Sequence, residues 1–181
     1  MSYFPFISDV ILRSNLDLTF NCIIELLTVS ESETYQDKGK QSLVSSLRKT
    51  IIIHIASIIE ALLLWKFKQV CSTQIIELTD EWKYLDIKVI HKIDDSQEII
   101  AGLRKKEKIN INRIDFLRTT RLCRKYGIIS SEKLEKDIDK VRELRNRMHI
   151  GGLSEIEKEY KRSDLKFCFD VAKRVKKLVA K

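Results

Sequence analysis

The chain has 181 residues and a formal net charge of +8, from 34 Lys+Arg against 26 Asp+Glu. Five glycines and one proline are too few for the many tight turns of a β-sandwich or barrel, so the composition favours an all-α protein built of long helices. Four cysteines lie far apart without a C-x-x-C pair, which argues against a disulfide framework or a structural zinc site and fits reduced thiols.

Two long helices are predicted in the first part of the chain. Residues 6–29 and 41–70 carry apolar side chains at helical spacing. The centre of the second segment is apolar nearly all round, as expected for the most buried member of an antiparallel bundle of four to five helices. Its apolar run between Lys49 and Lys66 is short and contains Glu60, so we expect no membrane span.

Residues 72–110 allow two interpretations. The stretch EWKYLDIKVIHKI alternates in part and is rich in β-branched and aromatic residues, and DDSQ offers a turn before a second apolar run. This pattern favours a β-hairpin inserted around residues 80–110 of a single domain covering 1–181, over two short helices. Such an insertion would act as a cap or a specificity element.

A third, strongly basic helix is predicted over residues 112–126. Ile114, Leu117 and Leu122 are expected to face the core, and Gly127 to end the helix. Its cations exceed what solubility requires, and we interpret them as a surface for a nucleic-acid backbone. The predicted RNA-binding residues are Arg118, Arg121, Arg124, Lys125 and, further along the chain, Arg147.

Two further helices complete the predicted fold. One begins after a cap at Ser130 or Ser131, runs through the stretch VRELRNRMHIGG and is ended by Gly151 and Gly152. The last helix is expected over 163–179, and before it a capping box, Ser154 with Glu157, predicts an additional short helix. The expected inward stripes are Leu134, Ile138, Val141, Leu144 and Met148 in the first helix, and Leu165, Phe169, Ala172, Val175 and Val179 in the last.

The stretch VRELRNRMHIGG contains the residues that most strongly indicate a chemical function. Arg145 falls near the middle of an apolar stripe, where a guanidinium is costly unless paired. Arg142, Asn146 and His149 lie along one edge of the same helix. Residues four apart are neighbours on a helix, so Arg145 and His149 are expected to meet, with His149 in the final turn beside open space.

A carboxylate on the second helix is the expected partner of Arg145. Glu60 also lies in a mostly apolar segment, and the free-energy cost of burying each of the two charges is reduced if they pair. We predict that Glu60 meets Arg145 across the core, or that Glu60 and Ser57 hydrogen-bond to the helix that carries VRELRNRMHIGG (the motif helix) and fix its arginines. The alternative is that Glu60 lies at the edge of the bundle in water. His54, on a mostly apolar face, is interpreted as a core histidine.

The order of residues near the end of this helix resembles the signature of the HEPN superfamily (higher eukaryotes and prokaryotes nucleotide-binding). That signature is an arginine, a polar residue, a few further residues and a histidine. Six residues separate Arg142 from His149, but Glu143 follows it; Arg145 is followed by Asn146, but only three residues separate it from His149. Both arginines are therefore candidates for the motif position. The resemblance implies a helical domain and a homodimer that pools the Arg and His residues of two copies.

The cluster suits RNA cleavage. A histidine moves protons near neutral pH, and an arginine clamps phosphate. Without an acidic cluster for a metal, the natural nucleophile is the 2′-hydroxyl of RNA, and the predicted activity is a metal-independent endoribonuclease without cofactor that leaves a 2′,3′-cyclic phosphate. The catalytic candidates are Arg142, Arg145, Asn146 and His149, supported by Glu60 and Ser57.

Charge distribution agrees with a polyanionic partner. Residues 1–103 hold 10 Lys+Arg against 14 Asp+Glu, and residues 104–181 hold 24 against 12. By analogy with HEPN proteins we expect a cytoplasmic toxin or antiviral-defence protein, with RNA, a second copy and an antitoxin or regulatory protein as partners. Two alternatives stay open: a non-catalytic HEPN-like module that binds nucleotides, RNA or a partner, and a purely structural role for the motif.

Overall fold

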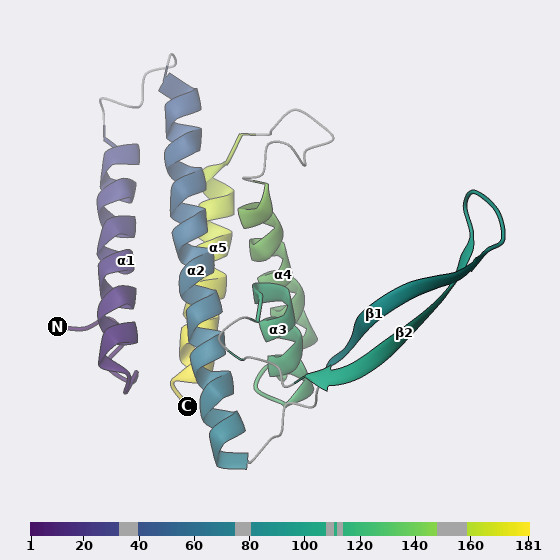
Figure 1. The fold of residues 1–181 in the computed structure, drawn as a ribbon. Helices are drawn as coiled ribbons and strands as arrows, with labels where there is room; N and C mark the ends of the chain where they lie inside the picture. Colours follow the sequence, from purple (N-terminus) through teal and green to yellow (C-terminus); the bar gives the residue numbers. More distant parts are fainter. Residues whose placement is uncertain (33–39, 75–80, 108–110, 112–113, 148–158) are drawn as a thin grey trace. The chain divides into compact units, whose positions relative to one another are not determined.

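The computed structural model of the chain describes all residues except 33–39, 75–80, 108–110, 112–113 and 148–158 (Figure 1). The described part is mostly helical, with one small antiparallel sheet. It divides into two compact units: a helical unit, Met1–Gln69 with Phe116–Lys181, and a second unit, Val70–Asp115. The elements are α1 (Val10–Ser30), α2 (Gln41–Gln74), β1 (Glu81–Lys92), β2 (Glu98–Glu107), α3 (Phe116–Lys125), α4 (Glu132–Asn146) and α5 (Arg162–Val179).

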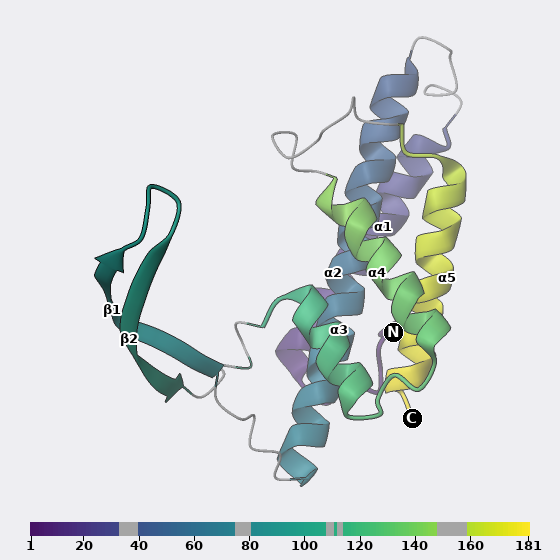
Figure 2. The same ribbon diagram turned by 90° about the vertical axis from the view of Figure 1, so that its right-hand side faces the viewer.

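The core of the helical unit is built around α2. Two views of the ribbon show α1, α4 and α5 beside this helix (Figures 1 and 2). The apolar centre of α2 is buried along one broad face, but Ile53, Ala61 and Leu64 on the other side are only half-buried, so the expectation of the most buried helix is confirmed in part. Its fully buried residues include Ile51, Ile52, Ile55, Ile59, Leu62, Leu63 and Phe67.

By length and composition alone, Gln41–Ser72 of α2 passes as a candidate membrane span, and half of its most apolar window is buried inside the protein. The core helix of a globular protein meets the same criterion.

A capping aspartate sets the start of α1. The sequence pattern predicted a helix from residue 6, but α1 begins at Val10, because the Asp9 carboxylate accepts a hydrogen bond of 2.9 Å from the backbone N–H of Leu12. The residues before it pack as an aromatic cluster: the rings of Tyr3 and Phe20 lie 4.5 Å apart between centroids.

The inward face of α3 differs from the predicted one. The buried residues are Phe116, Thr119, Thr120 and Cys123, whereas Leu117 and Leu122 are only half-buried. The larger Phe116 is 2% exposed and takes the core position, which turns the helix relative to the expected stripe. The hydroxyl of Thr120 is accommodated there because it donates to the Phe116 carbonyl at 2.9 Å. Gly127 follows the helix with φ 74°, as its role as a helix stop requires.

Most of the predicted inward stripe of α4 is confirmed. Leu134, Ile138, Val141 and Leu144 are all buried, and Ser131 caps the helix by accepting the N–H of Leu134 at 3.3 Å. Met148, Gly151, Gly152, Ser154 and Glu157 lie outside the described residues.

The stripe of α5 is confirmed in part. Leu165, Val175 and Val179 are buried, but Cys168 and Val171 take the central core positions. Phe169 and Ala172, which were predicted to point inward, are half-buried because they lie one residue further round the helix.

The second unit contains the predicted β-hairpin. β1 and β2 pair antiparallel, and the alternative of two short helices is wrong. β1 is two residues longer than β2, and two register shifts absorb the difference, one between Leu85 and Lys88 and one between Val89 and His91. At the first bulge Asp86 adopts a φ of 51°, a conformation that aspartate tolerates better than most residues.

Candidate active site

The candidate site lies at the C-terminal end of α4. The helix ends at Asn146, with Arg147 as its C-cap, earlier than the glycine-based prediction. Leu144 is its last buried residue; Arg145 is half-buried, and Asn146 and Arg147 are exposed. His149 lies outside the described residues.

An ion pair joins this end of α4 to the centre of α2. Nη1 of Arg145 lies 3.5 Å from Oε2 of Glu60, and the two side chains are 32% and 25% exposed. The predicted contact between these two residues is confirmed, but both side chains are partly exposed, so they do not meet across the core as predicted. The pair is placed at the edge of the core, where each group keeps some solvent and the cost of burying charge is reduced.

Ser57 does not take part in this contact. Its hydroxyl is exposed and donates to the carbonyl of Ile53, four residues earlier in the same helix, at 3.0 Å. The prediction that Ser57 hydrogen-bonds to the motif helix is therefore wrong, because a serine inside a helix readily satisfies itself on the preceding turn.

Replacing Glu60 by alanine is expected to lower the free energy of unfolding by about 1 to 2 kcal/mol, because it leaves the half-buried Arg145 guanidinium without this carboxylate. Urea denaturation measures the change. Glu25→Ala, on an exposed position of α1, is the matched control and should change stability by no more than about 0.5 kcal/mol. Equal effects of the two substitutions would contradict a stabilising pair.

The second motif arginine is held within α4 itself. Nε of Arg142 lies 3.3 Å from Oδ1 of Asp139, and the side chains are 21% and 37% exposed. Arg142 and Arg145 are three residues apart, so they share one side of the helix. Each arginine thus has a carboxylate, one from its own helix and one from α2.

Tyr160 fastens the same end of α4 to α2, and sequence reasoning missed it. Its side chain is 3% exposed, and its hydroxyl donates to the carbonyl of Leu144 at 3.3 Å. Its backbone N–H donates to the Ser45 hydroxyl at 2.9 Å, and Arg48 donates to its carbonyl at 3.4 Å. The only sequence signal was an isolated aromatic residue before the last helix.

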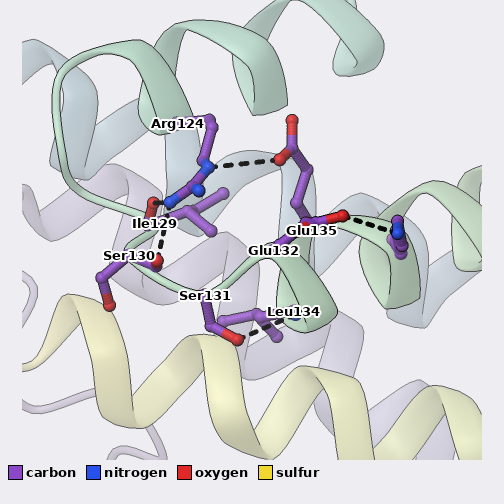
Figure 3. A network of polar contacts seen from close by, with 8 residues as sticks. Arg124, Ile129, Ser130, Ser131, Glu132, Leu134 and Glu135 are labelled. Atoms are coloured by element: carbon purple, nitrogen blue, oxygen red, sulfur yellow. Dashed lines mark hydrogen bonds and ion pairs between the residues drawn. The ribbon is translucent and has the colours of Figure 1, made fainter.

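Arg124, predicted to bind RNA, is engaged in the turn between α3 and α4 (Figure 3). Its Nη1 donates to the carbonyls of Ile129 at 3.0 Å and Ser130 at 2.6 Å, and its Nε lies 3.3 Å from Oε2 of Glu135. These contacts satisfy backbone carbonyls that α3 and α4 leave unpaired. The side chain therefore has a structural role, whatever else it binds.

The other predicted RNA-binding residues differ in exposure. Arg121, Lys125 and Arg147 are exposed, and Arg118 is half-buried. Nζ of Lys125 lies 5.4 Å from the ring centroid of Tyr126. That ring packs 5.8 Å from the ring of Phe67, as expected for an aromatic residue next to a helix end.

Along α4 lies a depression of about 330 Å³ whose lining includes neither Arg142 nor Arg145. Three cations and two anions line it. The lining residues are Lys136, Asp139, Lys140, Glu143, Leu144 and Arg147.

In the described part of the chain, the possible metal ligands do not cluster and the Cys168 thiol is buried. No group of three or more His, Cys, Asp or Glu side chains in this part of the chain could hold a metal ion. Burial raises the pKa of the Cys168 thiol to about 12, so it stays protonated and is a poor nucleophile. His54 is half-buried, with Nε2 3.9 Å from Sγ of Cys22, as fits a core histidine.

Stability is expected to fall as the pH rises above the ordinary thiol pKa of about 9, because the unfolded chain then loses the Cys168 proton that the folded chain retains up to about pH 12. Urea denaturation at pH 8 and at pH 10 measures this loss. The Cys168→Ala variant should lack the part of this stability loss that the thiol causes. An unchanged pH dependence in that variant would contradict the assignment.

Comparisons with known proteins give no relative for this chain: no family model, no curated protein and no solved structure matches it.

Proposed function

We propose that the chain is a metal-independent endoribonuclease whose site is built on Arg142, Arg145, Asn146 and His149. The proposed architecture is a HEPN-like antiparallel helical bundle, with two copies of the chain sharing one active site in the cytoplasm. The resemblance of the VRELRNRMHIGG stretch to the HEPN signature supports this assignment.

The observation that carries the proposal is the ion pair between Arg145 and Glu60. A guanidinium has five N–H donors, and one carboxylate oxygen occupies only part of them. Arg145 is 32% exposed and is held by Glu60 of α2, so its remaining N–H groups can donate hydrogen bonds to a phosphate. A carboxylate that holds the arginine in place also limits the entropy lost when phosphate binds.

In the proposed reaction, neutral His149 takes the proton of the RNA 2′-hydroxyl. The 2′-oxygen attacks the adjacent phosphorus, and the bond from phosphorus to the 5′-oxygen breaks. The arginines stabilise the charge that builds on the phosphoryl oxygens. His149 of the second copy donates a proton to the departing 5′-oxygen, so the products are a 2′,3′-cyclic phosphate and a 5′-hydroxyl.

Incubation with RNA in EDTA tests the activity directly. A single-stranded RNA and the matching 2′-deoxy strand are compared, and the products are analysed by mass spectrometry. Only the ribose strand should be cut, and the 5′ fragment should carry a cyclic phosphate. Cleavage of the deoxy strand, or cleavage that EDTA abolishes, would contradict the mechanism.

A second candidate is a HEPN-like module that binds RNA or nucleotides without cutting. It is favoured by the imperfect spacing of the motif, because Glu143 follows Arg142 and only three residues separate Arg145 from His149. Fluorescence anisotropy separates the two functions: a binder retains labelled RNA intact over hours. An antitoxin or regulatory protein is proposed as a further partner, on the HEPN resemblance alone.

A further inference from the structure

A cavity of about 270 Å³ lies within the helical unit, lined by residues of α1, α2, α5 and the segment before α1. Most of its wall is aliphatic or aromatic. A concave site with apolar walls and a few polar groups is the usual form of a small-molecule site. The main wall residues are Phe4, Phe20, Ile23, Ile55, Ile58 and Leu62, and all of them except Phe20 are buried.

A small residue of α5 helps to keep this space open. Ala172 lines the cavity between Phe169 and Lys176, which lie three and four residues away on the same side of the helix. Only a methyl group enters the cavity at position 172, where a longer side chain would fill part of it. The N-terminal wall is held against α1, because the backbone N–H of Tyr3 donates to the Asp17 carboxylate at 2.8 Å.

The charged residues that line the cavity all come from α5. They are Lys173, Lys176 and Asp170. Nζ of Lys176 lies 5.2 Å from the ring centroid of Phe4, and Lys173 and Asp170 are exposed. In the described part of the chain, none of these three groups takes part in an ion pair. Two ammonium groups against one carboxylate at the edge of an apolar space favour a ligand with an anionic head group.

The volume of the cavity limits the size of this ligand. A water molecule takes about 30 Å³ in the liquid, and at this volume per non-hydrogen atom the cavity holds roughly nine atoms. The apolar part of a ten-carbon carboxylate is of this size. A nucleotide fits the site poorly, because its polar groups would be buried against walls that offer few hydrogen-bond partners.

We propose that the cavity binds an amphiphilic anion, a medium-chain carboxylate. Its hydrocarbon chain fills the space between α1, α2 and α5, and its head group lies beside Lys173 and Lys176. Burial of the chain supplies most of the affinity, and the lysines at the rim select the charge. The site is separate from the proposed active site, since none of the residues proposed for RNA cleavage lines the cavity.

Isothermal titration calorimetry with decanoate, below the concentration at which it forms micelles, tests the binding. One decanoate per chain should bind, with a dissociation constant of about 10 to 100 μM. Octanoate, which has two methylene groups fewer, should bind about tenfold more weakly. Decanol should bind less tightly than decanoate, and decyltrimethylammonium, with the opposite charge, less tightly than decanol.

A charge reversal at the rim tests the placement of the head group. Lys173→Glu should weaken decanoate binding about fivefold and change the affinity for decanol less than about twofold, because the apolar walls remain. Asp170→Asn should strengthen decanoate binding about twofold by the same reasoning. Lys177→Glu, an exposed neighbour on α5 outside the lining, is the control of equal charge change and should leave both affinities close to the wild-type values.

Filling the cavity tests the placement of the hydrocarbon chain. Ala172→Phe should weaken the binding of decanoate and of decanol at least about tenfold, because the ring takes the space of several methylene groups. Ala61→Phe, at a half-buried position of α2 outside the lining, is the matched control and should retain both affinities. Thermal unfolding of each variant shows whether it is folded.

Three results would overturn the inference: no saturable binding of decanoate to the wild type up to about 1 mM, equal affinities for decanoate and decyltrimethylammonium, or undiminished binding in a folded Ala172→Phe variant. If Ala172→Phe does not fold, the comparison of Lys173→Glu with Lys177→Glu decides, and equal affinities of these two variants for decanoate would overturn the site. RNA cleavage is measured separately, and its presence or absence leaves this inference unchanged.

Discussion

Replacing His149 by alanine is expected to lower the rate of RNA cleavage by about 10²- to 10⁴-fold, the range typical for removal of a general base. Thermal unfolding should change little, because the proposed role of His149 is proton transfer. The measurement is single-turnover cleavage of one RNA strand at enzyme excess, together with calorimetry of the same preparation.

His91→Ala is the matched control for this substitution. His91 is exposed on β1 and has no part in the proposed site, so its loss should leave the cleavage rate unchanged. A variant of His149 that cuts as fast as the wild type would contradict the mechanism. A variant that loses stability and activity in proportion would instead identify a structural histidine.

The helices were predictable because each long element carries a strong apolar period. α2 is apolar nearly all round and α4 presents four buried residues at regular spacing, and both patterns were evident in the sequence. The face of α3 was not predictable, because its core contacts include two threonines. Thr120 counts as polar in a pattern, yet its hydroxyl is satisfied by the Phe116 carbonyl four residues earlier.

The contact between Arg145 and Glu60 was predictable for a different reason. Each charge interrupts an apolar stripe, where an unpaired charge would destabilise the fold. The two charges were therefore expected to pair with each other. No comparable anomaly marks Tyr160 or Arg124. Their partners are backbone carbonyls, of Leu144 for the former and of Ile129 and Ser130 for the latter, and a carbonyl left open by a turn leaves no trace in the sequence.

The two motif arginines are expected to differ in their contribution to catalysis. Arg145→Gln should lower single-turnover cleavage by about 10²- to 10³-fold, as for loss of one preorganised donor to a developing oxyanion. Arg142→Gln should cost about tenfold. The reason is that Glu60, on the separate helix α2, fixes Arg145, whereas Arg142 is held by Asp139 on its own helix.

The 2′-deoxy strand distinguishes a catalytic from a binding role, because it binds without being cut. Its affinity should fall by a similar small factor in both variants, while the cleavage rate falls far more in Arg145→Gln. Arg145→Gln also leaves the Glu60 carboxylate without the guanidinium, so the double variant with Glu60→Gln is needed: it should recover stability but not activity. Recovery of cleavage in the double variant, or a larger loss in Arg142→Gln, would show that Arg142 occupies the motif position.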